Sequence, residues 1–125
     1  MKTVINYKNA PAPIGPYSQA ILKNNTLYAS GQIAINPATN ELVLDSITTE
    51  TTQVMENVKS VLEAANMDFS NLVKCSIFLS DMKNFDAVNK VYASYFSDLP
   101  PARETVAVLG LPKNVNVEIS FIAIL

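Results

Sequence analysis

The sequence has 125 residues, which is typical of one domain, so we expect a single domain over residues 1–125. Its net charge is −2 and its nine Lys and Arg residues are scattered, which argues against nucleic acid as the main partner. There is no histidine and only one cysteine, Cys75, so Ser-His-Asp catalysis, Cys-His catalysis, a zinc site and an internal disulfide are not expected.

Sequence features also predict where in the cell the protein is found. No apolar run approaches the roughly 20 residues that span a bilayer, and the first residues turn polar too early for a secretory signal. A lone cysteine suits a reducing compartment. We therefore expect a cytoplasmic protein with no membrane partner. Only 16% of the residues are charged, which is compatible with some surface being buried against copies of the chain.

The first third of the chain predicts short strands joined by turns. Residues 3–7 indicate a strand, and the proline-rich segment 9–16 excludes regular structure. Residues 18–22 and 26–30 flank the pair Asn24-Asn25, which tolerates positive φ angles, so this segment predicts a β-hairpin. Residues 36–40 form another cluster of turn-forming residues.

The middle of the chain predicts a helix from about Thr48 to about Ala65. Its apolar residues recur with helical spacing, namely Val54, Val58, Val61, Leu62 and Ala65. Ser46 or Thr48 is expected to cap the helix, and Glu50 lies in the first turn, where the helix dipole favours an acidic residue.

The remainder predicts a strand, a second helix and two closing strands. Residues 72–80 alternate between apolar and polar, as strands do. The second helix places one set of apolar residues on one side: Phe85, Val88, Tyr92, Tyr95 and Phe96. It begins near a cap at Asp81 or Asn84 and cannot continue through Pro100-Pro101. Residues 104–108 and 115–125 indicate the closing strands.

The resulting order, β-β-β-α-β-α-β-β, predicts an α+β fold with a mixed sheet of about six strands and both helices on one face. In the last strand one apolar row, from Val115 to Ala123, is expected to face the helices. The alternating row with Asn116, Glu118 and Ser120 then faces either water or another subunit.

Two charged residues are candidates for chemistry. Glu118 is a solvated surface charge in the ordinary interpretation, and a carboxylate that positions or deprotonates water in the functional one. Arg103 follows the rigid pair Pro100-Pro101, and its planar guanidinium suits capture of a carboxylate. A structural ion pair is the alternative for Arg103. Glu104 is a poor partner because neighbouring residues of a strand point to opposite faces.

Three further positions also have an ordinary and a functional interpretation. Tyr17 either packs in the core or lines a pocket with its hydroxyl free to bind a ligand. Gly31 marks either a β-bulge or a close approach of a ligand to the backbone. Asn89 is either a solvated or capping amide or part of a site. Cys75 lies on the apolar row of its strand and is expected to act as a small hydrophobic residue.

Several segments together resemble the RidA/YjgF/UK114 family. They cover essentially the whole chain in order: Ala10 to Ala20, Ser30 to Ile33, Asn57 to Lys59, Val88-Asn89, Pro101 to Arg103 and Val117 to Ile119. The resemblance implies a chorismate-mutase-like (bacillus-type) fold and a homotrimer with clefts between subunits. It also implies hydrolysis of 2-aminoacrylate/2-iminopropanoate and 2-iminobutanoate to 2-keto acids and ammonia, without a cofactor or metal.

The resemblance also implies roles for individual residues. Arg103 would hold the substrate carboxylate with help from the backbone of Gly31, and Glu118 would hold the attacking water. Tyr17 and Asn89 would line and order the pocket. Thr105 stands where many members carry Cys, at a substrate-binding position that acts mainly through its backbone carbonyl. Ala107 replaces a frequent Glu, which is expected to affect subunit contacts.

Other functions remain open on the same fold. The main alternative is a regulatory protein that binds a small carboxylate without turnover. Ribonuclease and chaperone activities are attached to some relatives, but the sequence pI of about 5.0 and the missing histidine make RNA cleavage awkward.

Overall fold

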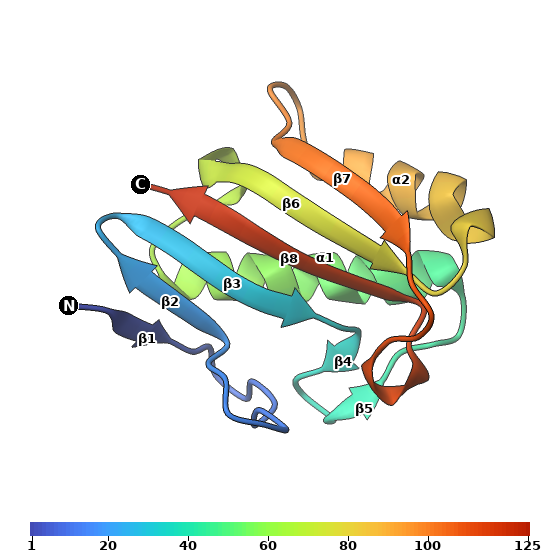
Figure 1. Ribbon diagram of the computed structural model, residues 1–125, viewed down its shortest axis with the longest axis horizontal. Helices are drawn as coiled ribbons and strands as arrows, with labels where there is room; N and C mark the ends of the chain where they lie inside the picture. The colour runs from blue at the N-terminus through green and yellow to red at the C-terminus, as the bar shows by residue number, and fades with distance from the viewer.

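Six strands form one mixed sheet in the order β1-β2-β3-β8-β6-β7 (Figure 1). The computed structural model describes all residues, 1–125. Only β6 and β7 are parallel, and the other neighbours in the sheet are antiparallel. The strands are β1 (Thr3–Ile5), β2 (Ala20–Lys23), β3 (Thr26–Gln32), β6 (Leu72–Leu79), β7 (Ala102–Ala107) and β8 (Val117–Ile124).

Both long helices, α1 (Ile47–Ala64) and α2 (Phe85–Ala93), lie on one face of this sheet (Figure 1). The expected α+β class, six-stranded mixed sheet and two-helix layer are therefore confirmed. Smaller elements complete the chain: the two-stranded pair β4 (Ile35–Asn36) and β5 (Glu41–Leu42), and the 3-10 turns η1 (Phe69–Asn71), η2 (Met82–Asn84) and η3 (Pro112–Asn114). No helix is both long and apolar enough to cross a bilayer.

The core lies between the sheet and the two helices, as the alternation of β8 predicts. Val117, Ile119, Phe121 and Ala123 are buried on the helix side, whereas Glu118 and Ser120 lie on the other side and are only partly buried. Helix α1 contributes its apolar stripe to the same core, and Ser46 caps it by accepting a hydrogen bond from the Thr49 amide at 3.1 Å.

Several boundaries differ from those expected. Strand β1 ends at Ile5, and β2 begins at Ala20 instead of residue 18. Strand β3 begins at Thr26 as predicted but continues to Gln32, and the turn between the two strands has φ of 50° and 63° at Asn24 and Asn25. Strand β7 begins at Ala102 instead of residue 104, because the parallel pairing with β6 starts at Lys74 and Ala102. Strand β8 begins at Val117 instead of residue 115, because Val115 caps the η3 turn and the Asn116 amide donates to the Glu50 carboxylate instead of to a neighbouring strand. The pair β4 and β5 is not predicted by the sequence pattern.

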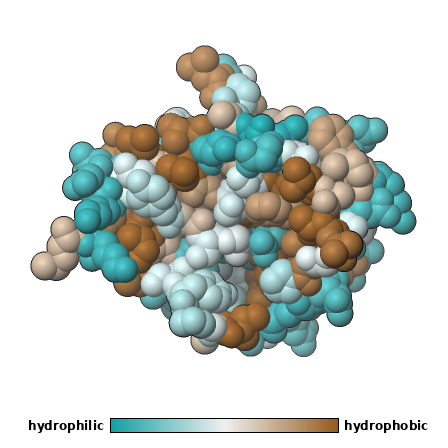
Figure 2. All heavy atoms as spheres, in the orientation of Figure 1, coloured by the Kyte–Doolittle hydropathy of each residue, from teal (hydrophilic) through white to brown (hydrophobic).

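The second face of the sheet has no covering element within the chain. Figure 2, seen from this side, shows groups of apolar side chains interspersed with polar ones. Tyr28, Val106 and Ile124 are 52%, 41% and 44% exposed here, although all three lie in strands. Such a half-apolar sheet face is suited to contact with another protein surface.

Candidate active site

The candidate residues divide between two cavities of the chain. The larger, of about 550 Å³, is lined by Tyr17, Gly31 and Glu118. The smaller, of about 400 Å³, is lined by Asn89 and Arg103. The candidates therefore form two groups in the isolated chain.

The first group is built around a bulge in β3. The pairing of β3 with β8 shifts register between Ala29 and Gln32, so Ser30 and Gly31 form the bulge that was one interpretation of this segment. Gly31 has no positive φ, so the lack of a Cβ is what matters. A Cβ at Gly31 would lie 2.6 Å from the Glu118 carboxyl carbon.

Glu118 is half-buried and carries an unpaired charge. The three ion pairs of the chain involve other carboxylates, and no basic side chain lies within 4.0 Å of Glu118. Burial raises the pKa of Glu118 above its ordinary value, because removal from water disfavours the charged form. A carboxylate that is directed into a cavity and has a raised pKa is suited to accept a proton from water.

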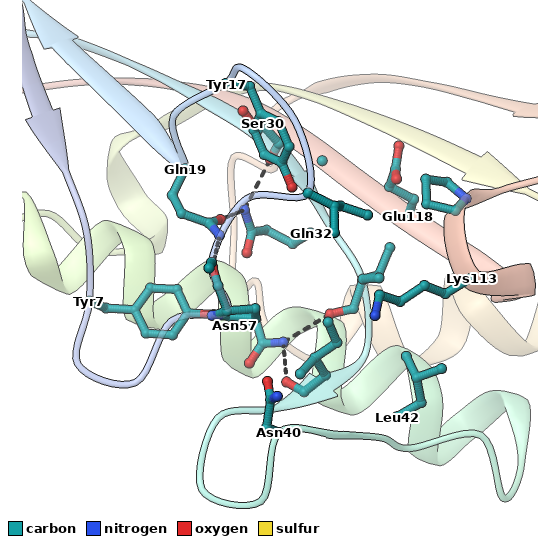
Figure 3. A pocket seen from close by; sticks show the side chains of 17 residues that line it. Tyr7, Tyr17, Gln19, Ser30, Gln32, Asn40, Leu42, Asn57, Lys113 and Glu118 are labelled. Carbon is teal, nitrogen blue, oxygen red and sulfur yellow. Dashed lines mark hydrogen bonds between the residues drawn. The ribbon is translucent and has the colours of Figure 1, made fainter.

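Tyr17 belongs to the same group. Its side chain is 46% exposed, so the interpretation of Tyr17 as a core residue is wrong. Figure 3 shows the ring beside Ser30 at one end of the cavity, with Glu118 at the same end. The aromatic ring therefore forms a wall of the cavity that contains the free carboxylate.

The second group centres on Arg103. Its guanidinium lies 5.1 Å from the ring centroid of Tyr92 and 5.9 Å from that of Phe85. Arg103 Nη1 donates a hydrogen bond to Asn89 Oδ1 at 2.5 Å. No carboxylate lies within 4.0 Å of Arg103, so the ion-pair interpretation is wrong. Asn89 binds Arg103, so its interpretation as a solvated or capping amide is also wrong.

These contacts hold the guanidinium in one orientation while leaving its charge unneutralised. Two rings and one amide oxygen surround Arg103, and none of them is an anion. Tyr92 is itself fixed by burial, and its hydroxyl lies against the Cys75 thiol without an oxygen or nitrogen partner. A positioned, unpaired guanidinium is suited to bind a carboxylate.

The two groups lie on opposite faces of the sheet. Arg103 pairs in register with Cys75, which is buried on the helix side. Glu118 pairs with Phe78, three residues further along β6 and therefore on the opposite side from Cys75. One chain does not bring Arg103 and Glu118 to a single small ligand, because the sheet separates them.

Thr105 lies in neither cavity. It follows Arg103 by two residues on β7 and shares the helix side of the sheet, and its hydroxyl is buried without a hydrogen-bond partner. Glu104 points to the opposite face, where it forms an ion pair with Lys74 at 2.8 Å. Cys75 is buried, as expected, and burial raises the pKa of its thiol.

Several polar residues of the larger cavity were not among the predicted site residues. Lys113 enters it from the η3 turn, and the buried amides of Gln19, Gln32 and Asn57 line its inner wall. Asn57 donates to the carbonyl oxygens of Ile33 and Ile35, both at 2.9 Å. Two sequence signals point to Asn57: it begins the family-like segment Asn57 to Lys59, and it lies on the apolar stripe of α1, where a polar residue needs a buried partner.

A further missed residue, Glu50, connects α1 to the strand that carries Glu118. Glu50 is completely buried, and its carboxylate accepts hydrogen bonds from the amides of Asn116 and Val117 at 2.7 and 3.1 Å. The Asn116 side chain donates a third bond at 2.8 Å. Glu50 lies four residues before Val54 and therefore on the apolar stripe of α1. This position is the sequence signal that Glu50 is buried.

The fold and these two cavities define a small α+β protein with the free carboxylate of Glu118 in one cavity and the free guanidinium of Arg103 in the other. Comparison with known proteins identifies its family. Residues 7–125 match the family model described as Endoribonuclease L-PSP. The chain belongs to this family, which includes the RidA and YjgF proteins.

Relatives at high similarity span nearly the whole chain. A RutC family protein of Pyrococcus horikoshii is 50% identical over 123 residues, which are 98% of each chain. The 2-iminobutanoate/2-iminopropanoate deaminase of Capra hircus is 44% identical over 99% of this chain and 90% of its own. The solved structure of YyfA from Yersinia pestis, a member of the conserved Rid protein family, superposes with a TM-score of 0.95 at 49% identity, covering all of both chains.

Proposed function

We propose that this protein hydrolyses small 2-imino acids, including 2-iminopropanoate and 2-iminobutanoate, to 2-keto acids and ammonia. The observation that carries the proposal is the free, half-buried carboxylate of Glu118, which faces a cavity and approaches the backbone at Gly31. The name of the Capra hircus relative supports the same reaction.

Glu118 is proposed to act on the attacking water. The water oxygen adds to the imine carbon while one of its protons passes to the Glu118 carboxylate, which gives a tetrahedral carbinolamine. Glu118 then returns this proton to the nitrogen, and the C–N bond breaks with loss of ammonia. The hydroxyl proton passes to the Glu118 carboxylate as the carbonyl forms, and leaves from there to the released ammonia. The raised pKa of Glu118 suits a group that takes up and releases a proton in one cycle. Its charge also favours the protonated, more electrophilic imine.

Arg103 is proposed to hold the substrate carboxylate and so to orient the imine carbon towards the water. Asn89 fixes the guanidinium, Tyr17 forms a wall of the cavity, and the backbones of Gly31 and Thr105 are proposed as further contacts. Orientation supplies much of the rate in such a reaction, because the imine is already reactive.

Because Arg103 and Glu118 lie on opposite faces of one sheet, we propose that each active site combines residues of two subunits. The uncovered sheet face, with exposed Tyr28, Val106 and Ile124, supports association with copies of the chain. A homotrimer is the expected assembly, and closed rings of this kind form from head-to-tail interfaces. Ala107 lies at the end of the edge strand β7, which is compatible with a subunit contact.

The experiment couples a serine or threonine dehydratase to this protein and measures how much imine a semicarbazide trap captures. We expect wild type to reduce semicarbazone formation, and R103A and E118Q to lose this effect while staying folded. Mixing the two inactive variants after unfolding and refolding should restore about a quarter of the wild-type activity, because some sites then combine an intact Arg103 with an intact Glu118. A mixture that stays inactive, although mixed oligomers form, would contradict the shared site.

The alternative function is carboxylate binding without turnover. It predicts that wild type leaves semicarbazone formation unchanged yet binds 2-keto acids in calorimetry, and that R103A abolishes this binding. The free carboxylate of Glu118 favours the hydrolase, because binding an anionic ligand does not need a second anion in the same site.

A further inference from the structure

The larger cavity contains a second charged residue, Lys113, that the proposed reaction does not use. Of the side chains that line this cavity, only Glu118 and Lys113 are ionic. Lys113 comes from the η3 turn and has φ 57° and ψ 21°, a left-handed conformation that is uncommon outside glycine. Figure 3 shows its ammonium pointing into the cavity, between Glu118 and Leu42 in this view.

The charge of Lys113 has no partner in the chain. No carboxylate lies within 4.0 Å of its ammonium, because the three ion pairs involve Lys59, Lys74 and Lys83. The turn that carries it is fixed: Pro112 precedes it, the Asn114 amide donates to the Leu111 carbonyl at 3.0 Å, and Asn114 is also left-handed at φ 56°. The turn therefore directs an unpaired cation into the cavity.

The larger cavity has more room than the proposed substrates need. A three- or four-carbon imine occupies only part of about 550 Å³. The apolar side chains of Ile33 and Leu42 also line this cavity, and Figure 3 shows Leu42 next to Lys113. The apolar side chains suit the methylene groups of a longer substrate side chain, and the ammonium of Lys113 suits an anionic group at its end.

We propose that the active site accepts 2-imino dicarboxylates, and that Lys113 binds the carboxylate at the end of their side chain. This inference rests on the proposed function. In the assembled site the charges are Arg103 positive, Glu118 negative and Lys113 positive. A protonated 2-imino dicarboxylate carries the complementary sequence: a negative α-carboxylate, a positive imine nitrogen and a negative terminal carboxylate. Such complementarity sets specificity between ligands of similar size.

The test compares two imines with the same number of carbons. An amino-acid oxidase with catalase generates the imine of glutamate or of norvaline, which lacks the terminal carboxylate, and the semicarbazide trap measures hydrolysis. The measured quantity is the ratio of kcat/KM for the glutamate imine to that for the norvaline imine. K113M should lower this ratio about tenfold or more, K113E should lower it further, and K113R should retain it within about threefold.

The matched control is K59M, which removes the same charge from an exposed position on α1, where Lys59 forms only an i,i+4 pair with Glu63. K59M should leave the ratio within about twofold of wild type. An unchanged ratio in K113M would mean that Lys113 is a solvated residue at the rim and would overturn the proposal. Wild-type hydrolysis of the norvaline imine without hydrolysis of the glutamate imine would also overturn it.

Failure of the hydrolase itself is distinguishable. If wild type hydrolyses neither imine, the proposed function falls, and calorimetry with 2-oxoglutarate and 2-oxopentanoate tests the Lys113 contact directly. Tighter binding of 2-oxoglutarate to wild type, lost in K113M and kept in K59M, would support the contact. Equal affinities of wild type and K113M for 2-oxoglutarate would overturn it.

Discussion

The carboxylate of Glu118 occupies the space that a side chain at Gly31 would need. A Cβ on Gly31 would lie 2.6 Å from both Cδ and Oε2 of Glu118 and 2.8 Å from its Cγ. The two residues meet because the bulge in β3 displaces Ser30 and Gly31 from the regular pairing with β8. The backbone at Gly31 therefore forms one wall against which the carboxylate is positioned.

G31A should displace the Glu118 side chain and lower kcat/KM in the trap assay by about tenfold or more, because small errors in catalytic geometry are costly. G110A is the matched control, since a Cβ at Gly110 meets no atom within 4 Å. We expect G110A to retain wild-type activity and both variants to remain folded by circular dichroism. Full activity in G31A would show that the reaction does not depend on this contact.

Glu118 should also make stability depend on pH. Burial raises its pKa above 4.5, so the folded protein binds this proton more tightly than the unfolded chain. The stability that this proton contributes is fully present below about pH 4.5 and is lost as the pH rises through the raised pKa. E118Q should therefore have a higher Tm than wild type at pH 7, and the difference should shrink towards pH 4.

The check is a series of thermal unfolding curves for wild type and E118Q between pH 4 and 7, at one protein concentration. A Tm of E118Q below that of wild type at pH 7 would argue that the ionised carboxylate has a stabilising partner in the assembled protein. In the trap assay, wild-type kcat/KM should fall on acidification with a midpoint above 4.5, as Glu118 becomes protonated.

Most of the fold could be predicted from local patterns. The Asn24-Asn25 turn, the helical spacing from Val54 to Ala65 and the alternation in β8 each depend on neighbours in sequence, and each predicts its element. The start of β7 could not be predicted, because it depends on pairing with β6, about thirty residues earlier in the chain. The left-handed turn at Lys113 has no glycine to reveal it.

Less of the candidate site than of the fold could be predicted from the sequence. The alternation of β8 places Glu118 on the face away from the helices, but the bond between Arg103 and Asn89 requires knowledge of how α2 packs beside β7. The separation of Arg103 and Glu118 by the sheet follows from the register with β6, which no local pattern contains.

The ring of Tyr92 should be needed to orient Arg103, whereas its hydroxyl should not. The guanidinium lies over this ring at 5.1 Å, and the buried hydroxyl has no oxygen or nitrogen partner. Y92L should raise KM in the trap assay about tenfold with a smaller change in kcat, because carboxylate binding loses an oriented guanidinium. Y92F should restore KM and leave stability equal or higher by up to about 1 kcal/mol.

Steady-state kinetics over a range of substrate, with unfolding curves for the three proteins, checks this prediction. A purely structural role for Tyr92 would give equal losses of activity and stability in Y92L, with no selective change in KM. R103K, which keeps the charge but loses the planar guanidinium, should also raise KM, since an ammonium neither stacks in the same way nor binds a carboxylate with two parallel bonds.

Glu50 should be essential for the position of the strand that carries Glu118. Its buried carboxylate accepts two backbone N–H groups at the start of β8 and the side-chain amide of Asn116. Asn116 in turn binds Ser80 at the end of β6, since its carbonyl accepts from the Ser80 amide at 3.0 Å. In E50Q an amide nitrogen replaces one acceptor oxygen and faces N–H donors, which leaves a buried donor unpaired.

E50Q should therefore lower the free energy of unfolding in urea by about 1–3 kcal/mol, and should lower kcat/KM at temperatures where the variant is still folded. E63Q provides the comparison, because Glu63 is exposed and its contact with Lys59 is 3.9 Å long. Its effect should stay within about 0.5 kcal/mol. Equal stability of E50Q and E63Q would mean that the three hydrogen bonds of Glu50 do not help to hold β8 against α1. The position of Glu118 would then depend on Gly31 and the sheet pairing alone.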